Sequence, residues 1–190
     1  MPESLVSPVV LVPIKRFSSA KGRLREVMDP HDVRDLARRL AESVLDAARP
    51  RRTLVVCDDD EVARFASDRG VGVVRTSSTT LNGAVTEAYR QIVDADFVII
   101  AHADLCDPLG LGDFAPGPGV TVVTDHHRRG TNVLALPAGE DFHFHYGADS
   151  AHLHQREAGR LGLACAVVTD SRWAFDVDEP QDLEGLPYGI

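Results

Sequence analysis

Lys15 and Lys21 are the only lysines in the chain, and both lie in the segment KRFSSAKGR at 15–23. The other 18 of the 20 basic residues are arginines. The compact lysine ammonium binds phosphate as a point charge, and a loop of small residues can offer backbone N–H groups to the same oxygens. The segment therefore favours polyphosphate binding over the alternative of a solvated basic loop.

Three aspartates form a second candidate group. Asp104 follows the apolar run FVIIA at 97–101, and Asp176 and Asp178 alternate along the segment FDVDEP. Alternate residues of an extended chain point the same way, so this pair could join Asp104 in holding Mg²⁺. The alternatives are that Asp104 caps a turn and that Asp178 caps a final helix that begins at Pro180.

A third group could hold a small anion. The segment Gly130-Thr131-Asn132 lies at the start of an apolar run, and YGADS at 146–150 leads into a helical pattern. The N–H groups at a helix N-terminus favour a phosphate or carboxylate, and the Thr131 and Ser150 hydroxyls could donate hydrogen bonds to it. At the least, Asp149 or Ser150 is expected to cap the helix.

Six of the eight histidines lie between 126 and 154. His143 and His145 would share one face of a strand, a spacing that can bind zinc, although no third ligand of obvious spacing accompanies them. His154 lies one helical turn after Ser150, over the proposed anion site.

The elements that must position these groups follow from the apolar runs. Helical spacing predicts helices at 34–48, 61–69, 81–93 and 150–161, with a turn or helix after Pro180. Strands are predicted at 8–14, 53–57, 71–74, 97–101, 119–125, 132–137 and 163–168. The alternation implies right-handed βαβ units and a mainly parallel sheet, with antiparallel pairing between 119–125 and 132–137. Ligands of such sheets bind at the carboxyl ends of the strands, where the candidate groups lie.

Composition narrows the class of protein. The 190 residues carry a formal net charge of −9, which argues against a nucleic-acid partner and favours small molecules. No apolar stretch approaches the ~20 residues of a membrane span, and the start of the chain does not read as a secretory signal. The three cysteines are far apart, which indicates neither disulfides nor a cysteine zinc site. We expect one domain, 1–190, in the cytoplasm.

Five ordered segments carry a family resemblance: VPIKRFSSAKGRL at 12–24, LNGA at 81–84, ADL at 103–105, GTN at 130–132 with YGADSAHLH at 146–154, and DVDEPQDL at 176–183. With them the chain resembles the 2-phospho-L-lactate and phosphoenolpyruvate guanylyltransferases of coenzyme F-420 biosynthesis. The resemblance implies an α/β, Rossmann-like fold of the nucleotide-diphospho-sugar-transferase kind, with a mainly parallel mixed sheet flanked by helices. It also implies transfer of GMP from GTP to the phosphate of a small phosphorylated carboxylic acid.

The resemblance assigns roles to residues. It implies that Thr131, Gly147 and Ser150 hold the acid, and that Mg²⁺ is held by Asp104 with Asp176 or Asp178. Catalytic roles fall to Lys15, Lys21, Arg23 and Asp104. GTP is expected to contact Lys15, Ser18, Ser19, Lys21, Asp58, Leu81 and Asn82.

Several alternatives stay open at this point. The acid could be phospholactate, phosphoenolpyruvate or phosphoglycerate, and a homodimer is left open. Cys106 stands where the family usually has proline, which predicts a less rigid loop after Asp104, and Gly22 replaces a serine. A related nucleotidyltransferase, such as a molybdopterin guanylyltransferase or a sugar-phosphate cytidylyltransferase, is the second interpretation. A non-catalytic nucleotide-binding module is the third.

Overall fold

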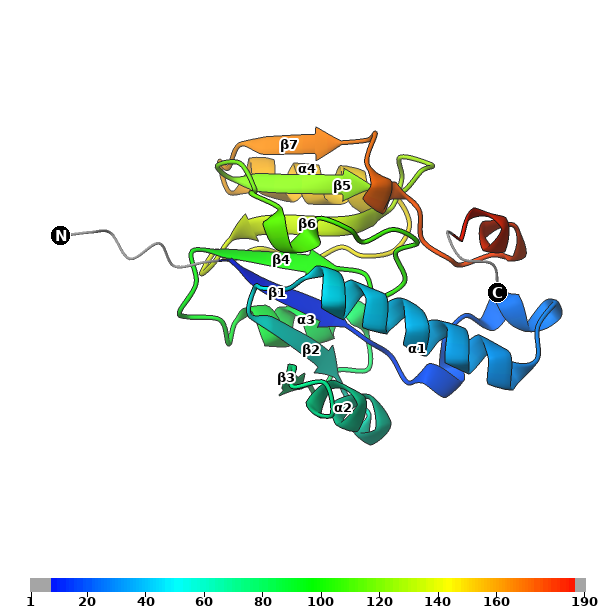
Figure 1. The fold of residues 1–190 in the computed structure, drawn as a ribbon. Coiled ribbons are helices and arrows are strands. Elements are labelled where there is room, and N and C mark those ends of the chain that lie inside the picture. The colour runs from blue at the N-terminus through cyan, green and yellow to red at the C-terminus, as the bar shows by residue number, and fades with distance from the viewer. Residues whose placement is uncertain (1–7, 187–190) are drawn as a thin grey trace.

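One mixed sheet of seven strands forms the centre of the fold (Figure 1). The computed structural model describes residues 8–186. All strands run parallel to one another except β6, which is antiparallel to its neighbours β4 and β5. In the order β3-β2-β1-β4-β6-β5-β7 the strands are Gly72–Arg75, Thr53–Cys57, Val9–Pro13, Phe97–Ala101, Thr131–Pro137, Val120–Thr124 and Cys165–Val168. The predicted mainly parallel sheet and its antiparallel pair are confirmed.

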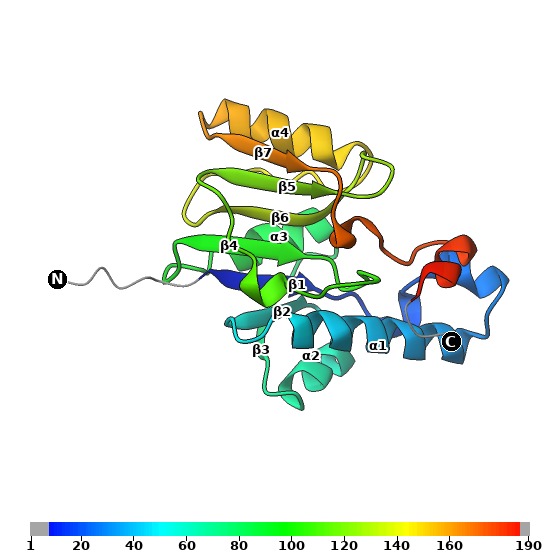
Figure 2. The same ribbon diagram turned by 45° about the horizontal axis from the view of Figure 1, so that its top comes forward.

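Helices cover both faces of the sheet (Figures 1 and 2). The helices α1 (Pro30–Ala47) and α2 (Asp60–Ser67) pack on one face, in a cluster that includes Val12, Val44 and Phe65. The helices α3 (Leu81–Tyr89) and α4 (Ser150–Arg160) pack on the other face. Alternate residues of the buried strands reach opposite clusters, so both faces of the central strands are apolar.

Two helix boundaries differ from the sequence prediction by four residues, and the others by two or fewer. Helix α1 begins at Pro30 and not at 34, because the Asp29 side chain accepts a hydrogen bond from the His31 N–H at 2.8 Å and Pro30 occupies the first turn. Helix α3 ends at Tyr89 and not at 93. Ile92 is buried there in a following turn, which extended the apolar spacing beyond the helix itself.

The chain after β7 crosses back to the first loop. The extended segment around Val177 inserts that side chain into a small cluster with Leu24, Val33 and Leu36. It ends in a 3-10 turn, Pro180–Gly185, which lies beside the first loop in both views (Figures 1 and 2). Glu179 is the N-cap of this turn, so the interpretation of Asp178 as its capping residue is wrong.

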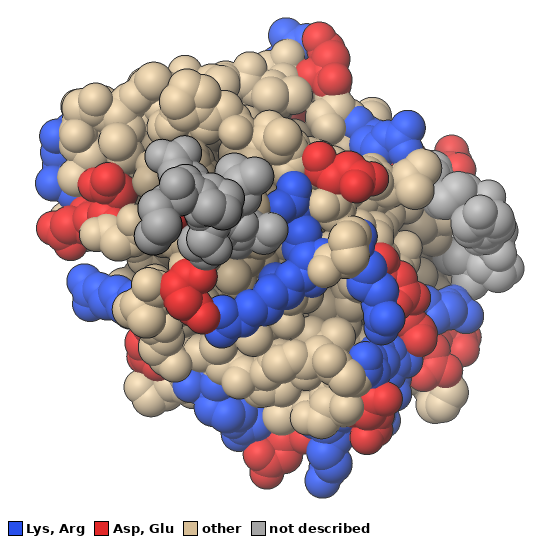
Figure 3. All heavy atoms as spheres, turned by 60° about the vertical axis from the view of Figure 1, so that its left-hand side comes forward, with Lys and Arg blue, Asp and Glu red and all other residues tan. Residues whose placement is uncertain are grey.

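Charge is mixed on the side at which the parallel strands begin. Figure 3 shows Lys and Arg side chains interspersed there with Asp, Glu and neutral residues. Among residues 8–186, none of the helices combines the length and the apolar character needed to cross a membrane.

Candidate active site

The carboxyl ends of β1, β2 and β4 meet the start of β6 at one edge of the sheet. Because β6 runs in the opposite direction, its first residues, and not its last, lie at this edge. The His102 N–H donates to the Asn132 carbonyl at 3.0 Å and extends the β4–β6 pairing by one step. The segments GTN and ADL are therefore neighbours in space.

The first loop is anchored by two buried side chains. Phe17 packs edge to face on Phe65, with ring centroids 5.1 Å apart, and Leu24 is fully buried. Between them, two 3-10 turns, Phe17–Ser19 and Gly22–Glu26, flank Lys21, whose φ of 54° is left-handed. Only a few per cent of residues other than glycine adopt such a backbone, which costs about 1 kcal/mol or more. This backbone conformation accompanies the inward direction of the Lys21 side chain.

Lys21 makes an ion pair with two of the three predicted metal ligands. Its Nζ contacts the carboxylate of Asp104 and lies 2.9 Å from Asp178 Oδ1, and the Lys21 side chain is only 5% exposed. Burial alone lowers the pKa of Lys21, but the two carboxylates outweigh it and raise that pKa above its ordinary value. Lys21 is therefore a buried, charged ammonium.

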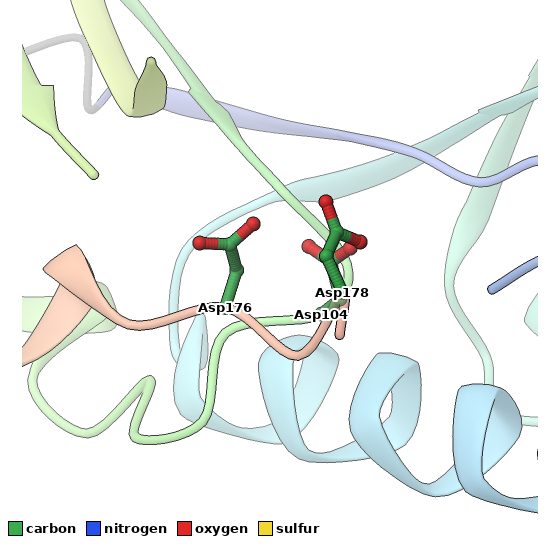
Figure 4. A group of neighbouring side chains, drawn as sticks. All are labelled: Asp104, Asp176 and Asp178. Atoms are coloured by element: carbon green, nitrogen blue, oxygen red, sulfur yellow. The ribbon is translucent and has the colours of Figure 1, made fainter. Parts of the chain in front are cut away.

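The three aspartates form one cluster, as predicted. Figure 4 shows their carboxylates pointing to the same side, with Asp176 and Asp178 on the C-terminal segment and Asp104 after β4. One oxygen from each lies within 4.8 Å of the others. The two segments are held together by backbone pairing, in which the Val177 N–H donates to the Asp104 carbonyl at 3.1 Å. Val177 points into the core, so its two neighbours point into the cleft.

The close approach of the three carboxylates shifts the pKa values within the cluster. Burial and the neighbouring Asp104 and Asp178 carboxylates raise the pKa of Asp176. Burial also acts to raise the pKa of Asp104, but Lys21 and His102 outweigh it and lower that pKa. Asp104 is therefore ionised. A bound cation would offset the repulsion between Asp176 and the two neighbouring carboxylates.

The cluster has the donors that a magnesium ion requires. Mg²⁺ binds carboxylate oxygens and leaves its other positions to water and substrate phosphates. Asp104 Oδ1 is buried and has no hydrogen-bond partner among residues 8–186, although its other oxygen contacts Lys21. An unpartnered buried carboxylate oxygen costs several times RT, so a ligand at this atom is expected.

Two adjoining cavities flank the first loop. One, of about 290 Å³, is lined by Lys15, Ser19, Asp58 and Leu81, four of the residues predicted to contact the nucleotide. The other, of about 360 Å³, is lined by the three aspartates, Lys21 and His102. Lys15, Ser19 and Leu81 line both cavities, so a bound molecule could extend from one into the other.

The lining of these cavities holds polar atoms without partners. Four buried side-chain nitrogen or oxygen atoms lack a hydrogen bond within the described part of the chain, and three belong to lining residues, Thr76, His102 and Asp104. Buried polar groups are usually satisfied in native proteins. Their concentration here indicates that a polar ligand completes the site.

Of the residues predicted to contact the nucleotide or to take part in catalysis, three do not line either cavity, and the three predicted to hold the acid also lie outside both linings. Arg23 pairs with Glu179 at 2.8 Å, and the Ser18 carbonyl accepts a hydrogen bond from Arg25. The Asn82 side chain holds the Tyr146 backbone from both sides, through Oδ1 at 2.6 Å and Nδ2 at 3.1 Å. The structure thus places Asn82 as a link between LNGA and the YGADS segment, and the roles of all three toward a nucleotide stay predictions.

Glycine is required at one position of the nucleotide side. A Cβ on Gly83 would overlap the Ser78 Oγ. Thr80 caps α3, because its side-chain oxygen accepts a hydrogen bond from the Gly83 N–H at 3.2 Å. Gly83 therefore lets the Ser77–Thr80 turn fold tightly against the helix beside the cavity.

The residues predicted to hold the acid gather around His154. Thr131 and Ser150 are buried, with their hydroxyl oxygens 3.2 Å apart, and Thr131 Oγ1 lies 3.0 Å from His154 Nδ1. Gly147 is exposed beside them. The prediction that Asp149 or Ser150 is the N-cap of α4 is confirmed for Asp149, although its side chain makes no capping hydrogen bond. Asp149 occupies the N-cap position with a left-handed backbone, and its carboxylate pairs with Arg129 at 2.9 Å.

His154 is a neutral, buried histidine. Its Nε2 accepts from the His145 N–H at 3.0 Å, which leaves the ring proton on Nδ1. Burial, with the nearby His145 and His102, lowers the pKa of His154 from 6.5 to about 3. Since the folded pKa lies below the unfolded one, its stabilising effect is complete above pH 6.5 and is lost as the pH falls toward 3.

We expect the free energy of unfolding to fall by about 1.4 kcal/mol per pH unit below 6.5, or about 2 kcal/mol between pH 6.5 and 5, because unfolding lets His154 take up a proton. Urea denaturation at both pH values measures this slope. His154→Gln should flatten it, whereas His152→Gln, an exposed residue on the same helix, should not. An unchanged slope in His154→Gln would contradict the assignment.

The zinc hypothesis at His143 and His145 finds no third ligand. His143 instead lies against Glu157, which accepts its backbone N–H at 2.8 Å. Among residues 8–186, the aspartate cluster is the one group of three metal-ligating side chains close enough to share an ion.

The sequence analysis assigned no individual role to two residues of the site, Asn132 and His102. Asn132 donates to Asp176 Oδ1 at 3.1 Å and to the Trp173 carbonyl at 3.0 Å, which fixes the direction of that carboxylate. His102 lies at the carboxyl end of β4, and the rule that found Asp104 there would have found it too.

The Cys106 departure has a structural counterpart. Its N–H donates to the Phe175 carbonyl at 2.9 Å, a bond that a proline at this position could not make. This hydrogen bond ties the loop to the C-terminal segment. It therefore offsets the flexibility that was expected because the loop lacks proline.

Comparisons with known proteins agree with this geometry. A family described as "Guanylyl transferase CofC like" matches residues 8–187. A phosphoenolpyruvate guanylyltransferase of Chloroflexus aggregans is 34% identical over 92% of this chain and 94% of its own length. One of Chloroflexus aurantiacus is 30% identical over 92% of each. A solved nucleotidyl transferase of Methanothermobacter is 15% identical, with a TM-score of 0.58 over 93% of this chain and 94% of its own. The likeness confirms the nucleotidyltransferase fold that the sequence predicted.

Proposed function

Because the chain belongs to the family of CofC-like guanylyl transferases, we propose that it transfers GMP from GTP to phosphoenolpyruvate, with release of pyrophosphate, in coenzyme F-420 biosynthesis. The observation that carries the proposal is the aspartate cluster with Lys21, beside two joined cavities. The substrate is taken from the two Chloroflexus relatives, which are phosphoenolpyruvate guanylyltransferases.

The cluster supports a magnesium-dependent reaction. Asp104 and Asp176 would hold the ion, with Asp178 as the exposed third carboxylate. Bound there, Mg²⁺ would neutralise charge on the phosphates of the nucleotide.

The chain's own residues position GTP and the phosphorylated acid and offset their negative charge. A phosphate oxygen of the acid attacks the α-phosphorus of GTP in line, a new P–O bond forms, and the bond to the β-phosphate oxygen breaks as pyrophosphate leaves. Lys15, exposed between the two cavities, is placed to bind the leaving phosphates. The site lowers the barrier by positioning and by electrostatic stabilisation, and no covalent enzyme intermediate is needed.

The remaining assignments extend the same proposal. Leu81, Asp58 and Ser19 would border the nucleoside, and Thr131, Gly147 and Ser150 would hold the acid. Ser18, Arg23 and Asn82 would act from positions outside the cavity lining. A reaction on GTP also suits the expected cytoplasmic location, and the homodimer stays a prediction.

The test is pyrophosphate release with GTP and Mg²⁺, comparing phosphoenolpyruvate, 2-phospho-L-lactate and 3-phosphoglycerate. We expect release only with GTP and chiefly with phosphoenolpyruvate, and no release in EDTA. ATP and CTP serve as nucleotide controls. Folded protein that releases no pyrophosphate with any of the three acids would overturn the proposal and favour a non-catalytic binding module.

A further inference from the structure

His102 lies between the aspartate cluster and the group around His154. Its ring packs on that of Tyr146, which in turn packs on the His154 ring with centroids 4.9 Å apart. It lines the cavity that holds the aspartates and does not line the cavity of Asp58 and Thr76. A phosphate that reacts at the metal while its acid is held near Thr131 must therefore pass beside this ring.

The imidazole of His102 has no hydrogen-bond partner. Neither ring nitrogen bonds to another group within residues 8–186, and Nε2 is enclosed as well. A buried ring nitrogen without a partner costs about 1–3 kcal/mol whether it donates or accepts, so a ligand is expected at Nε2. His154, by contrast, uses both of its ring nitrogens.

Neighbouring groups hold the His102 ring in place without forming a hydrogen bond to its nitrogens. The backbone N–H of His102 donates to the Asn132 carbonyl at 3.0 Å. The His102 ring packs on that of Tyr146, with centroids 5.4 Å apart and the planes at 41°. Tyr146 is itself fixed by Asn82. The donor is thus preorganised at a fixed position, which is what recognition of one anionic oxygen requires.

We infer that His102 donates a hydrogen bond from its imidazole N–H to the phosphate of the acceptor acid, and so holds the attacking oxygen next to the α-phosphorus. This inference rests on the proposed function. It predicts an effect on the acid and not on the nucleotide, because His102 does not line the cavity of Asp58 and Thr76, and its backbone pairs with Asn132, the neighbour of Thr131.

The test uses three variants of the full chain. His102→Phe keeps a ring that can pack on Tyr146 but removes the donor, while His102→Asn and His102→Gln keep an N–H near the two positions of the imidazole nitrogens. A hydrogen bond to a charged group is worth ~1.5–3 kcal/mol, so His102→Phe should lower kcat/KM for phosphoenolpyruvate roughly 10- to 100-fold. The KM for GTP should change less than twofold, and one of the amide variants should recover part of the loss.

Binding gives a readout that is independent of turnover. Calorimetric titration of phosphoenolpyruvate into protein saturated with Mg²⁺ and α,β-methylene GTP should show the same loss of affinity in His102→Phe. If wild-type protein is active but His102→Phe binds and uses phosphoenolpyruvate normally, the inference is overturned. Equal losses for GTP and the acid, with no recovery in either amide variant, would also overturn it and indicate a packing role. Inactivity of the wild-type protein with every acid would overturn the proposed function and this inference together.

Discussion

Replacing Asp104 with asparagine is expected to lower kcat/KM about 1,000-fold, or about 4 kcal/mol of transition-state stabilisation, because the amide cannot neutralise a cation at the phosphates. The substitution preserves the shape of the side chain. It removes the charge that Lys21 contacts and the oxygen that lacks a partner in the folded protein. Pyrophosphate release in saturating Mg²⁺ measures the effect.

Asp107→Asn is the matched control for this variant. Asp107 lies three residues further along the same loop and pairs with Arg172 at a distance of 3.5 Å, away from the cluster. We expect near-normal turnover from it. Folded Asp104→Asn protein that works within threefold of wild type would refute the proposed metal site.

Replacing Lys21 with methionine should destabilise the metal-free protein by about 3 kcal/mol, because it leaves the clustered carboxylates without their counter-charge. The estimate takes the low end of the range for a broken buried pair, since the Asp178 side chain is 57% exposed. Excess Mg²⁺ should restore most of the loss, because the cation then occupies the position of the ammonium. Turnover should still fall about 100-fold for lack of that charge in the transition state.

Lys15→Met provides the internal comparison, because the chain has only these two lysines. Lys15 is exposed and has no ion pair among residues 8–186. Its loss should change the free energy of unfolding by less than about 0.5 kcal/mol while weakening GTP binding. Denaturant titrations of both variants, in EDTA and in Mg²⁺, measure these changes in the free energy of unfolding. A Lys21→Met protein as stable in EDTA as wild type would contradict the assignment.

Most of the fold was predictable because its strands are continuous apolar runs. VVLVP, TLVVC and FVIIA are buried on both faces, and such runs of this length at this spacing favour a parallel sheet. The helix ends were less accessible. The start of α1 depends on a cap, Asp29-Pro30, that precedes the apolar stripe, and the end of α3 was hidden because Ile92 is buried outside the helix.

The site was predictable in its parts more than in its connections. The alternation of Asp176 and Asp178 gave their common direction, and the position after β4 gave Asp104. The ion pairs of Lys21 join residues 83 and 157 positions apart, and no local pattern encodes such a pairing. The buried state of Thr131 and Ser150 depends in the same way on how α4 packs.

The reversed direction of β6 brings the start of this strand to the carboxyl ends of β1, β2 and β4. Residues before 102 line the cavity of Lys15 and Asp58, whereas the residues predicted to hold the acid lie between β6 and α4, so under the proposed function each substrate has its own stretch of chain. Exchange of the later stretch between related genes would carry acceptor preference with it and leave the nucleotide cavity whole.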